Sequence, residues 1–221
     1  MSLAVFSTPT NIYHSPKKPK TMRTELPTSP DETIELLKDY GAVEQGHFIL
    51  ASGNHSAYYV KKGKLVQHPF ELQEMIEQRV DAMKALGQID VVLSPAMGGV
   101  PVGQQVGLAV HARTIYAERN AETNELELKR GFEIKPGERL LLVEDVITTG
   151  GTLLELTDFI AEQGGQVAGV FVVVNRSGKD KVGEFPVVSC MEIQFPVYAP
   201  DEVPGDLAAI PAVRPGTKRV E

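Results

Sequence analysis

The sequence predicts an α/β fold with a mainly parallel central sheet flanked by helices, and two patterns support this prediction. Near-continuous runs of Val, Leu and Ile, at residues 140–143 and 166–175, are typical of strands buried on both faces. From residue 89 onward such runs alternate with segments of helical periodicity, which indicates strands joined by crossover helices. A length of 221 residues suits one domain of ordinary size.

The expected start of order is residue 29. Residues 1–28 contain four prolines and the basic patch KKPK without apolar periodicity, so they read as a disordered tail. Ser29, Pro30 and Glu32 then carry the start signals of a helix that Gly41 ends.

Two further features are expected before the alternation begins. The segment GHFILASGNHSAYYV (46–60) reads as two short strands joined by a turn around Gly53 and Asn54. Pro69 begins a second helix with one apolar stripe, and Gly87 ends it.

The alternating region defines the expected sheet and one exception to it. We expect helices at 99–111 and 151–163, and strands at 89–94, 113–118, 139–145, 166–175 and 185–191. Residues 118–137 are too long and too charged for a tight connection, and their LELKRGFEI part resembles an exposed hairpin arm. A long polar excursion from a compact sheet is often a functional flap.

Composition excludes several classes of protein. A net charge of −7 and a pI near 5.3 argue against nucleic-acid binding as the main task. The single cysteine, Cys190, cannot form an internal disulfide or a cysteine-based zinc site, which favours a reducing cytoplasm. We expect no membrane association, because no apolar run approaches the roughly 20 residues of a membrane span and no signal core is present. The five histidines show no metal-ligand spacing.

The stretch LLLVEDVITTGGTLLE (140–155) points to a ligand site. Its two acids follow an apolar strand, and ligands of parallel sheets gather beyond the carboxyl ends of the strands. The next residues can direct backbone N–H groups and threonine hydroxyls at an anion beside a helix start. No Walker A loop or GxGxxG motif is present. The combination suits a sugar phosphate better than the alternative, an acidic helix-capping turn.

This stretch resembles the signature with which type I phosphoribosyltransferases bind 5-phosphoribosyl 1-pyrophosphate (PRPP). Together with residues 46–69, SPAMGGVPVG (94–103), the polar segment before 139 and VNRSG (174–178), it makes residues 29–198 similar to orotate phosphoribosyltransferases. The resemblance implies the type I phosphoribosyltransferase fold, as a single domain over 29–221. Its expected parts are a small hood at 46–66, a core at 88–198, a flexible hairpin flap and a C-terminal surface tail at 199–221.

The resemblance also implies an activity. It is the Mg²⁺-dependent transfer of the phosphoribosyl group from PRPP to N1 of orotate, which yields orotidine 5′-monophosphate and pyrophosphate in UMP synthesis. A cytoplasmic homodimer is expected, with PRPP and orotate as partners, no nucleic acid and no membrane. Two alternatives remain open: transfer to another base, and a non-catalytic PRPP-sensing regulator.

The site residues are carried over from the family's motifs. We expect PRPP to be bound by Glu144, Asp145, Val146, Ile147, Thr148, Thr149, Gly150, Gly151 and Thr152. Orotate is expected to contact Ser52, Gly53, Lys62, Thr148 and Arg176. The expected catalytic residues are Asp145, Arg119, Lys129 and Arg130. Mg²⁺ should arrive with PRPP and meet Glu144 and Asp145 through water, without a direct protein ligand.

The flap departs from the better-known family pattern. Residues 120–128 contain no cation, whereas the usual loop carries several lysines and a histidine. We expect the charge to come from Lys129 and Arg130 in the hairpin instead. Backbone amides of residues 96–99 are a further candidate contact for pyrophosphate.

Overall fold

The computed structural model describes residues 22–50 and 52–215, so the first 21 residues of the expected tail lie outside it. The helices are α1 (Pro30–Asp39), α2 (Gly63–Val66), α3 (Pro69–Glu77), α4 (Val80–Lys84), α5 (Gly99–Val110), α6 (Gly151–Glu162) and α7 (Gly205–Ala208). The strands are β1 (Val43–Ile49), β2 (His55–Val60), β3 (Val91–Pro95), β4 (Arg113–Arg119), β5 (Leu126–Leu128), β6 (Arg139–Ile147), β7 (Gln166–Asn175), β8 (Lys181–Val182), β9 (Phe185–Glu192) and β10 (Val197–Tyr198).

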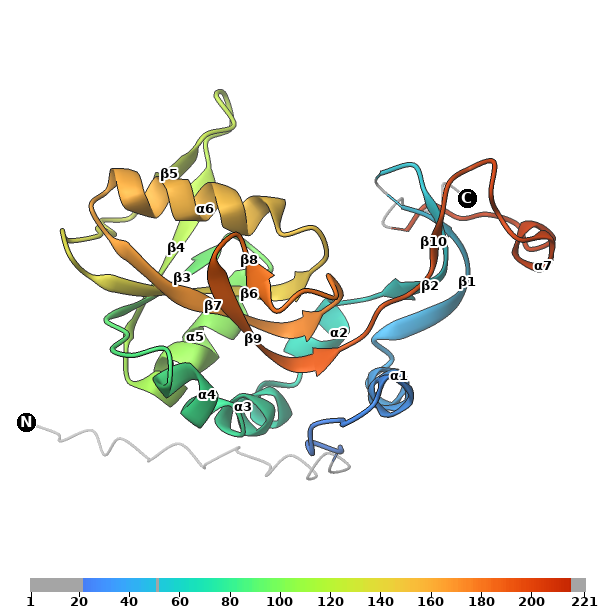
Figure 1. Cartoon of the computed structure of the whole chain (residues 1–221), viewed down its shortest axis with the longest axis horizontal. Helices are drawn as coiled ribbons and strands as arrows, with labels where there is room; N and C mark the ends of the chain where they lie inside the picture. Colours follow the sequence, from blue (N-terminus) through green and yellow to red (C-terminus); the bar gives the residue numbers. More distant parts are fainter. Residues whose placement is uncertain (1–21, 51, 216–221) are drawn as a thin grey trace, which may run out of the picture.

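The main sheet has the order β5-β4-β3-β6-β7-β9-β8. Its five central strands are parallel, and the two edge strands, β5 and β8, pair antiparallel. Helix α6 covers one face, and α3, α4 and α5 lie on the other (Figure 1). The expected α/β class and mainly parallel sheet are therefore confirmed.

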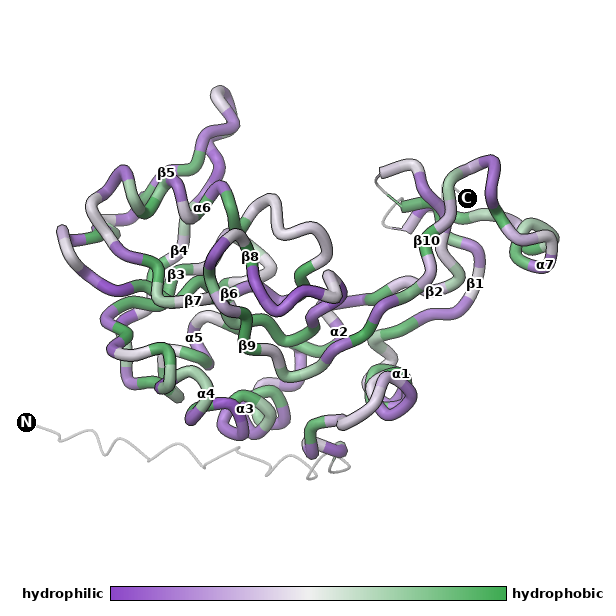
Figure 2. The backbone as a smooth tube through the Cα atoms, viewed as in Figure 1, coloured by the Kyte–Doolittle hydropathy of each residue, from purple (hydrophilic) through white to green (hydrophobic). Residues whose placement is uncertain are grey.

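Side chains alternate between two hydrophobic cores along the central strands. In β6, Leu140 and Leu142 pack with the apolar face of α6, whereas Leu141 and Val143 belong to the core that includes α3 and α5. All four residues are fully buried. Figure 2 shows that these apolar strands contrast with the hydrophilic loops around them. Burial on both faces explains why the strand runs are almost continuously apolar.

A second, smaller sheet forms the hood beside the main one (Figure 1). It has the order β1-β2-β10, so the chain returns to it after completing the main sheet. The C-terminal segment adds a further contact through Val213. The N–H of Val213 donates to His47 O (2.8 Å), and its carbonyl accepts from Ile49 N–H (2.9 Å). The expected surface tail after residue 199 is thus partly built into the hood.

The beginning of the described chain agrees with the capping signals. Ser29 Oγ accepts a hydrogen bond from Glu32 N–H at the start of α1. Residues 22–28, however, contact the folded domain: Gln78 donates to Thr24 O and accepts from Leu26 N–H. The expected boundary of the tail at residue 28 therefore falls too late.

Two other boundaries differ from expectation. The helix predicted from Pro69 to Gly87 is interrupted at residues 78–79, where the Gln78 amide turns to the backbone of the preceding segment. Strand β6 continues to Ile147, two residues beyond the expected end at residue 145, so Glu144 and Asp145 lie within the last residues of the strand. Within the described residues, no helix combines the length and hydropathy that a membrane span requires.

Candidate active site

The two acids of β6 occupy different environments at the carboxyl edge of the sheet. The Asp145 side chain is almost fully buried, and its Oδ1 accepts from Val146 N–H (2.7 Å) and from Lys62 Nζ (3.0 Å). Glu144 is partly exposed and accepts from Asp145 N–H (3.1 Å). Burial, with the charge of Asp145 as the second cause, raises the pKa of Glu144 to about 7. Glu144 therefore titrates close to neutral pH.

The loop after β6 encloses a small cavity at the start of α6. Gly150 has φ +82°, a left-handed conformation that suits glycine, and no side chain caps the helix that follows. The cavity has a volume of about 90 Å³ and is lined by Glu144, Val146, Ile147, Thr148, Thr149, Gly150, Gly151, Thr152 and Leu153. These include every residue expected to bind PRPP except Asp145. A free helix start surrounded by hydroxyls and small residues can bind a phosphate group.

Lys62 reaches Asp145 from the junction of β2 and α2. Burial alone would lower the pKa of this lysine, but the charges of Asp145 and Glu144 and the hydrogen bond to Asp145 raise it. Gly98, at the turn from β3 to α5, leaves the room for this pair. A Cβ there would lie 2.5 Å from Asp145 Oδ2 and 3.2 Å from Lys62 Nζ. Three segments far apart in sequence thus meet at one carboxylate.

Arg176 follows β7 and lies over an aromatic side chain. Its guanidinium carbon is 5.2 Å from the ring centroid of Phe195, which in turn stacks on Tyr58 at 4.6 Å. The Nε of Arg176 is buried and has no hydrogen-bond partner. Burial lowers the pKa of this arginine, and the Tyr59 phenol opposes the effect only in part. A buried donor without a partner is costly unless a ligand supplies the acceptor.

Asn175 organises the loop that carries Arg176. Its Nδ2 donates to Lys179 O (2.9 Å), while its Oδ1 accepts from Ser177 N–H (3.0 Å) and Oγ (2.7 Å). The backbone N–H of Arg176 donates to Ile147 O (2.9 Å) at the end of β6. The arginine is therefore fixed against the strand that carries the two acids.

The other expected orotate residues are not gathered at one point. Thr148 lines the loop cavity, whereas Ser52 and Gly53 lie in the hood turn between β1 and β2 and do not line it. Gly53 adopts φ +86° and donates its N–H to Leu50 O (2.9 Å), which closes the turn. Lys62 lies on Asp145, as described above.

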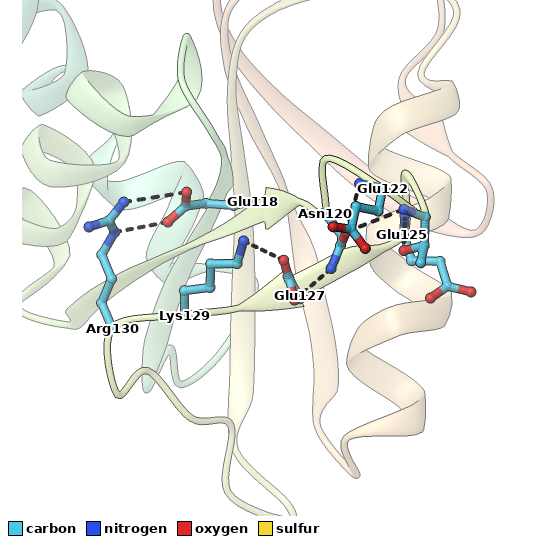
Figure 3. A network of polar contacts seen from close by, with 8 residues as sticks. Glu118, Asn120, Glu122, Glu125, Glu127, Lys129 and Arg130 are labelled. Atoms are coloured by element: carbon cyan, nitrogen blue, oxygen red, sulfur yellow. Dashed lines mark hydrogen bonds and ion pairs between the residues drawn. The ribbon is translucent and has the colours of Figure 1, made fainter.

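Each of the three flap cations expected to be catalytic is paired with a nearby carboxylate. Arg119 donates from Nη1 to Glu155 Oε1 on α6 (2.8 Å) and to Asn124 O (2.8 Å). Figure 3 shows the other two pairs along the β4–β5 hairpin, Lys129 with Glu127 and Arg130 with Glu118. The hydrogen bond that Arg119 donates to Glu155 raises the pKa of this arginine, and the one that Arg130 donates to Glu118 raises the pKa of Arg130. The flap is a hairpin, as expected, but its cations are neutralised in this conformation.

The sequence reasoning missed three residues of this site. Phe195 lies beyond the last expected strand, and only its place near Arg176 reveals its role. Gly98 and Asn175 stand in the motifs SPAMGGVPVG and VNRSG, so their positions were noticed, but not their contacts. Those contacts join segments that are distant in sequence, and no local pattern encodes them.

Comparison with known proteins identifies similar chains over most of the length. Residues 61–203 match the family described as the phosphoribosyl transferase domain. The chain is 40% identical to the orotate phosphoribosyltransferase of Caldicellulosiruptor saccharolyticus, over 85% of this chain and 97% of that protein. It is 39% identical to the orotate phosphoribosyltransferase of Pelotomaculum thermopropionicum, over 86% and 98% respectively. Among solved structures, the Mycobacterium tuberculosis orotate phosphoribosyltransferase in complex with inorganic phosphate is 26% identical with a TM-score of 0.56, over 75% of this chain and 97% of that one.

Proposed function

Because this chain belongs to the orotate phosphoribosyltransferase family, we infer that it is an enzyme that transfers the 5-phosphoribosyl group from PRPP to N1 of orotate. The products are orotidine 5′-monophosphate and pyrophosphate, in pyrimidine synthesis. The test is to mix the purified protein with PRPP, Mg²⁺ and orotate and to follow the loss of orotate absorbance. A correctly folded protein that leaves orotate unchanged would contradict the proposal.

The observation that most favours orotate over other bases is the buried, unpaired Nε of the partly exposed Arg176. Orotate carries a carboxylate, and its oxygens would supply the acceptor that Arg176 Nε lacks. The stacked rings of Phe195 and Tyr58 support the guanidinium from one side. Uracil and adenine have no carboxylate, so neither should compete well. Product formation in mixtures of orotate with each of these bases would test the choice.

We assign the PRPP site to the end of β6 and the loop after it. Residues 148–152 would bind the 5-phosphate through backbone N–H groups and hydroxyls at the start of α6. Glu144 and Asp145 would bind the ribose hydroxyls. Thr148 and the hood turn at Ser52 and Gly53 would contact orotate. A 5-phosphate at the loop and a carboxylate at Arg176 would hold the two substrates on neighbouring strands of one sheet edge.

The residues at this edge fit a substrate-carried Mg²⁺. Glu144 and Asp145 offer the hard oxygen ligands that Mg²⁺ prefers, and this ion is commonly held by one or two carboxylates together with substrate phosphates. The described residues contain no group of three or more His, Cys, Asp or Glu side chains that could hold a metal ion by themselves. When bound, Mg²⁺ would neutralise charge on the leaving pyrophosphate.

The protein's own residues would stabilise the rest of the charge. The sugar carbon gains positive character as pyrophosphate leaves, and the carboxylates of Glu144 and Asp145 lie at the edge where the ribose would bind. Arg119, Lys129 and Arg130 of the flap would meet pyrophosphate after releasing their carboxylate partners. Closure of the flap would also exclude water.

We further propose a homodimer in the cytoplasm, with the chain from residue 22 onward as one domain. The exposed apolar side chains of Phe70 (80% exposed) and Leu108 (70%) support an association surface. The buried free thiol of Cys190 suits a reducing compartment. Light scattering on the purified protein would measure the mass in solution, and a monomer at all concentrations would contradict the dimer.

A further inference from the structure

Lys62 differs from the other cations near the site in the way it is paired. Its side chain is 55% exposed, whereas that of its partner Asp145 is only 3% exposed. The flap cations, in contrast, pair with carboxylates that are themselves partly exposed. The ammonium of Lys62 therefore faces open space from a buried anchor, and a ligand can reach it without displacing the lysine from the site.

The ammonium of Lys62 lies at the turn between β3 and α5, away from the lining of the phosphate-loop cavity. Gly98 belongs to the turn between β3 and α5, and Lys62 Nζ would be 3.2 Å from a Cβ at that residue. The loop cavity at residues 146–153 includes neither Lys62 nor Gly98 among its lining residues. A ribose held by the two acids, with its 5-phosphate in the loop, would therefore direct its C1 substituent toward this turn.

From this geometry, and resting on the proposed function, we propose that Lys62 is a catalytic residue that binds the pyrophosphate of PRPP, and not orotate. In the free protein the lysine neutralises Asp145. When ribose hydroxyls engage the Asp145 oxygens, the ammonium turns its donors to the pyrophosphate. Gly98 is required because any side chain there would occupy the space that Asp145 and Lys62 share.

Lys62 gives up no proton in this reaction. The bond between C1 and the pyrophosphate oxygen breaks, and its electron pair leaves with pyrophosphate. The lone pair of orotate N1 forms the new bond to C1, and the N1 proton is lost to solvent. The lysine stabilises the charge that accumulates on the leaving oxygens.

The experiment compares Lys62→Ala and Lys62→Arg with Lys61→Ala. Lys61 is the neighbouring lysine, but it pairs with the exposed Glu44 and serves as the matched control. Binding of pyrophosphate with Mg²⁺ is measured by calorimetry, and the KM values for PRPP and orotate are measured separately. We expect Lys62→Ala to weaken pyrophosphate binding and raise the KM for PRPP by about 10- to 100-fold, as for loss of a charge-assisted hydrogen bond. The KM for orotate should change by less than about twofold, and Lys61→Ala should resemble the unmodified protein.

Three outcomes would overturn the assignment. If Lys62→Ala raises the KM for orotate and leaves pyrophosphate binding unchanged, Lys62 contacts orotate and not pyrophosphate. An effect of Lys62→Ala no larger than that of Lys61→Ala would make it a surface residue. Lys62→Ala could unfold because Asp145 is left unpaired, so Lys62→Arg, which keeps the charge, is the second variant. Its head group is longer and planar, so a direct contact with pyrophosphate should be altered. Unchanged pyrophosphate binding and an unchanged KM for PRPP in Lys62→Arg would contradict that contact.

The calorimetry also separates this inference from the proposed function. If the unmodified protein fails to convert orotate yet binds pyrophosphate through Lys62, the choice of orotate is wrong and the lysine assignment stands. If it converts orotate but Lys62→Ala binds pyrophosphate normally, the function stands and the lysine assignment is wrong.

Discussion

Glu144 is the residue of the site whose charge depends most on pH near neutrality. Its pKa is raised from an ordinary value to about 7, first by burial and then by the charge of Asp145. Below that pH the side chain is mainly protonated, so it repels neither Asp145 nor the phosphates of PRPP, but it also binds hydroxyls and Mg²⁺ less well. In the proposed PRPP site, the raised pKa of Glu144 would therefore couple PRPP binding to pH.

We predict that the KM for PRPP falls as the pH rises through about 7. Each pH unit below the pKa lowers the ionised fraction of Glu144 about tenfold, which sets the upper limit of the effect. Steady-state kinetics between about pH 6 and about pH 8 would measure it. Glu144→Gln cannot ionise, so its KM for PRPP should be high and nearly independent of pH in this range. A pH dependence that persists in this variant would contradict the assignment.

The same pKa shift also predicts how stability depends on pH: a rise in pH that improves PRPP binding should lower the stability of the fold. A carboxyl that binds its proton more tightly when folded than when unfolded lowers stability as the pH rises from its unfolded pKa to its folded pKa. For Glu144 this window runs from the ordinary value of 4.5 to about 7. Chemical denaturation should therefore show that Glu144→Gln gains stability relative to the unmodified protein as the pH rises across this window. An unchanged difference between the two proteins would contradict the raised pKa.

Arg176 allows a test of how the two substrates are divided between residues. We predict that Arg176→Ala raises the KM for orotate by about 10- to 100-fold, because a charge-assisted contact with the carboxylate is lost. The KM for PRPP should change little. Asp145→Asn should do the reverse and weaken use of PRPP. Lys179→Ala, an exposed cation in the same loop as Arg176, is the matched control. Equal losses for both substrates in both variants would refute this division.

At the scale of elements, the β4–β5 hairpin explains how a flap rich in acids can form. Glu118 and Glu127 are directly opposite each other across the two strands, an arrangement that is unfavourable by itself. Arg130 pairs with the first and Lys129 with the second (Figure 3), which compensates the repulsion. Residues 120–128 contain no cation, but Lys129 and Arg130 follow them directly and supply the positive charge of the hairpin. In the proposed mechanism, the flap would therefore have to break these ion pairs before its cations could meet pyrophosphate.

We predict that Glu155→Gln increases catalytic efficiency with PRPP by up to about fivefold. Glu155 on α6 holds Arg119, and an exposed ion pair of this kind contributes only modestly to stability, so its loss should free the arginine without unfolding the hairpin. The measurement is kcat/KM for PRPP at low and high salt, where screening should reduce the difference. Asp158→Asn, at an exposed position on the same helix, is the control. If Glu155→Gln lowers kcat/KM, the ion pair positions Arg119 and does not restrain it.

Sequence reasoning succeeded for elements whose signal is local. The five parallel strands of the main sheet have apolar runs, and α1 and α6 begin at recognisable capping or glycine signals, so their boundaries fall within a few residues of expectation. The short edge strand β8 (Lys181–Val182) has no such signal and was not predicted. Sequence reasoning failed where a tertiary contact decides. At the break between α3 and α4, Gln78 forms hydrogen bonds with Thr24 and Leu26, and the two-residue strand β10 pairs with β2. The contact of Lys62 with Asp145 is of the same kind.

At the scale of the whole molecule, the hood depends on segments from both ends of the chain. β1 and β2 come before the main sheet, and β10 and residue 213 come after it. His47 joins these parts, because its Nδ1 is 2.8 Å from Ile210 O and its Nε2 is 2.6 Å from His55 Nδ1. His55 begins β2 directly after the turn that contains Ser52 and Gly53. The C-terminal segment is thus connected to the turn proposed to contact orotate.

We predict that Val213→Pro loosens the hood and raises the KM for orotate while leaving the KM for PRPP unchanged. Proline has no N–H, so the hydrogen bond to His47 O is lost, which should lower the free energy of unfolding by about 0.5–1.5 kcal/mol and the melting temperature by a few degrees. Hydrogen exchange at the amides of β1 should accelerate, because Ile49 N–H donates to the carbonyl of the substituted residue. Val213→Ala retains both backbone hydrogen bonds and removes only a half-exposed side chain, so it is the matched control. If the two variants have the same KM for orotate and the same exchange rates in β1, the C-terminal segment has no part in shaping the hood, and the orotate site is formed by β1, β2 and the loop of Arg176 alone.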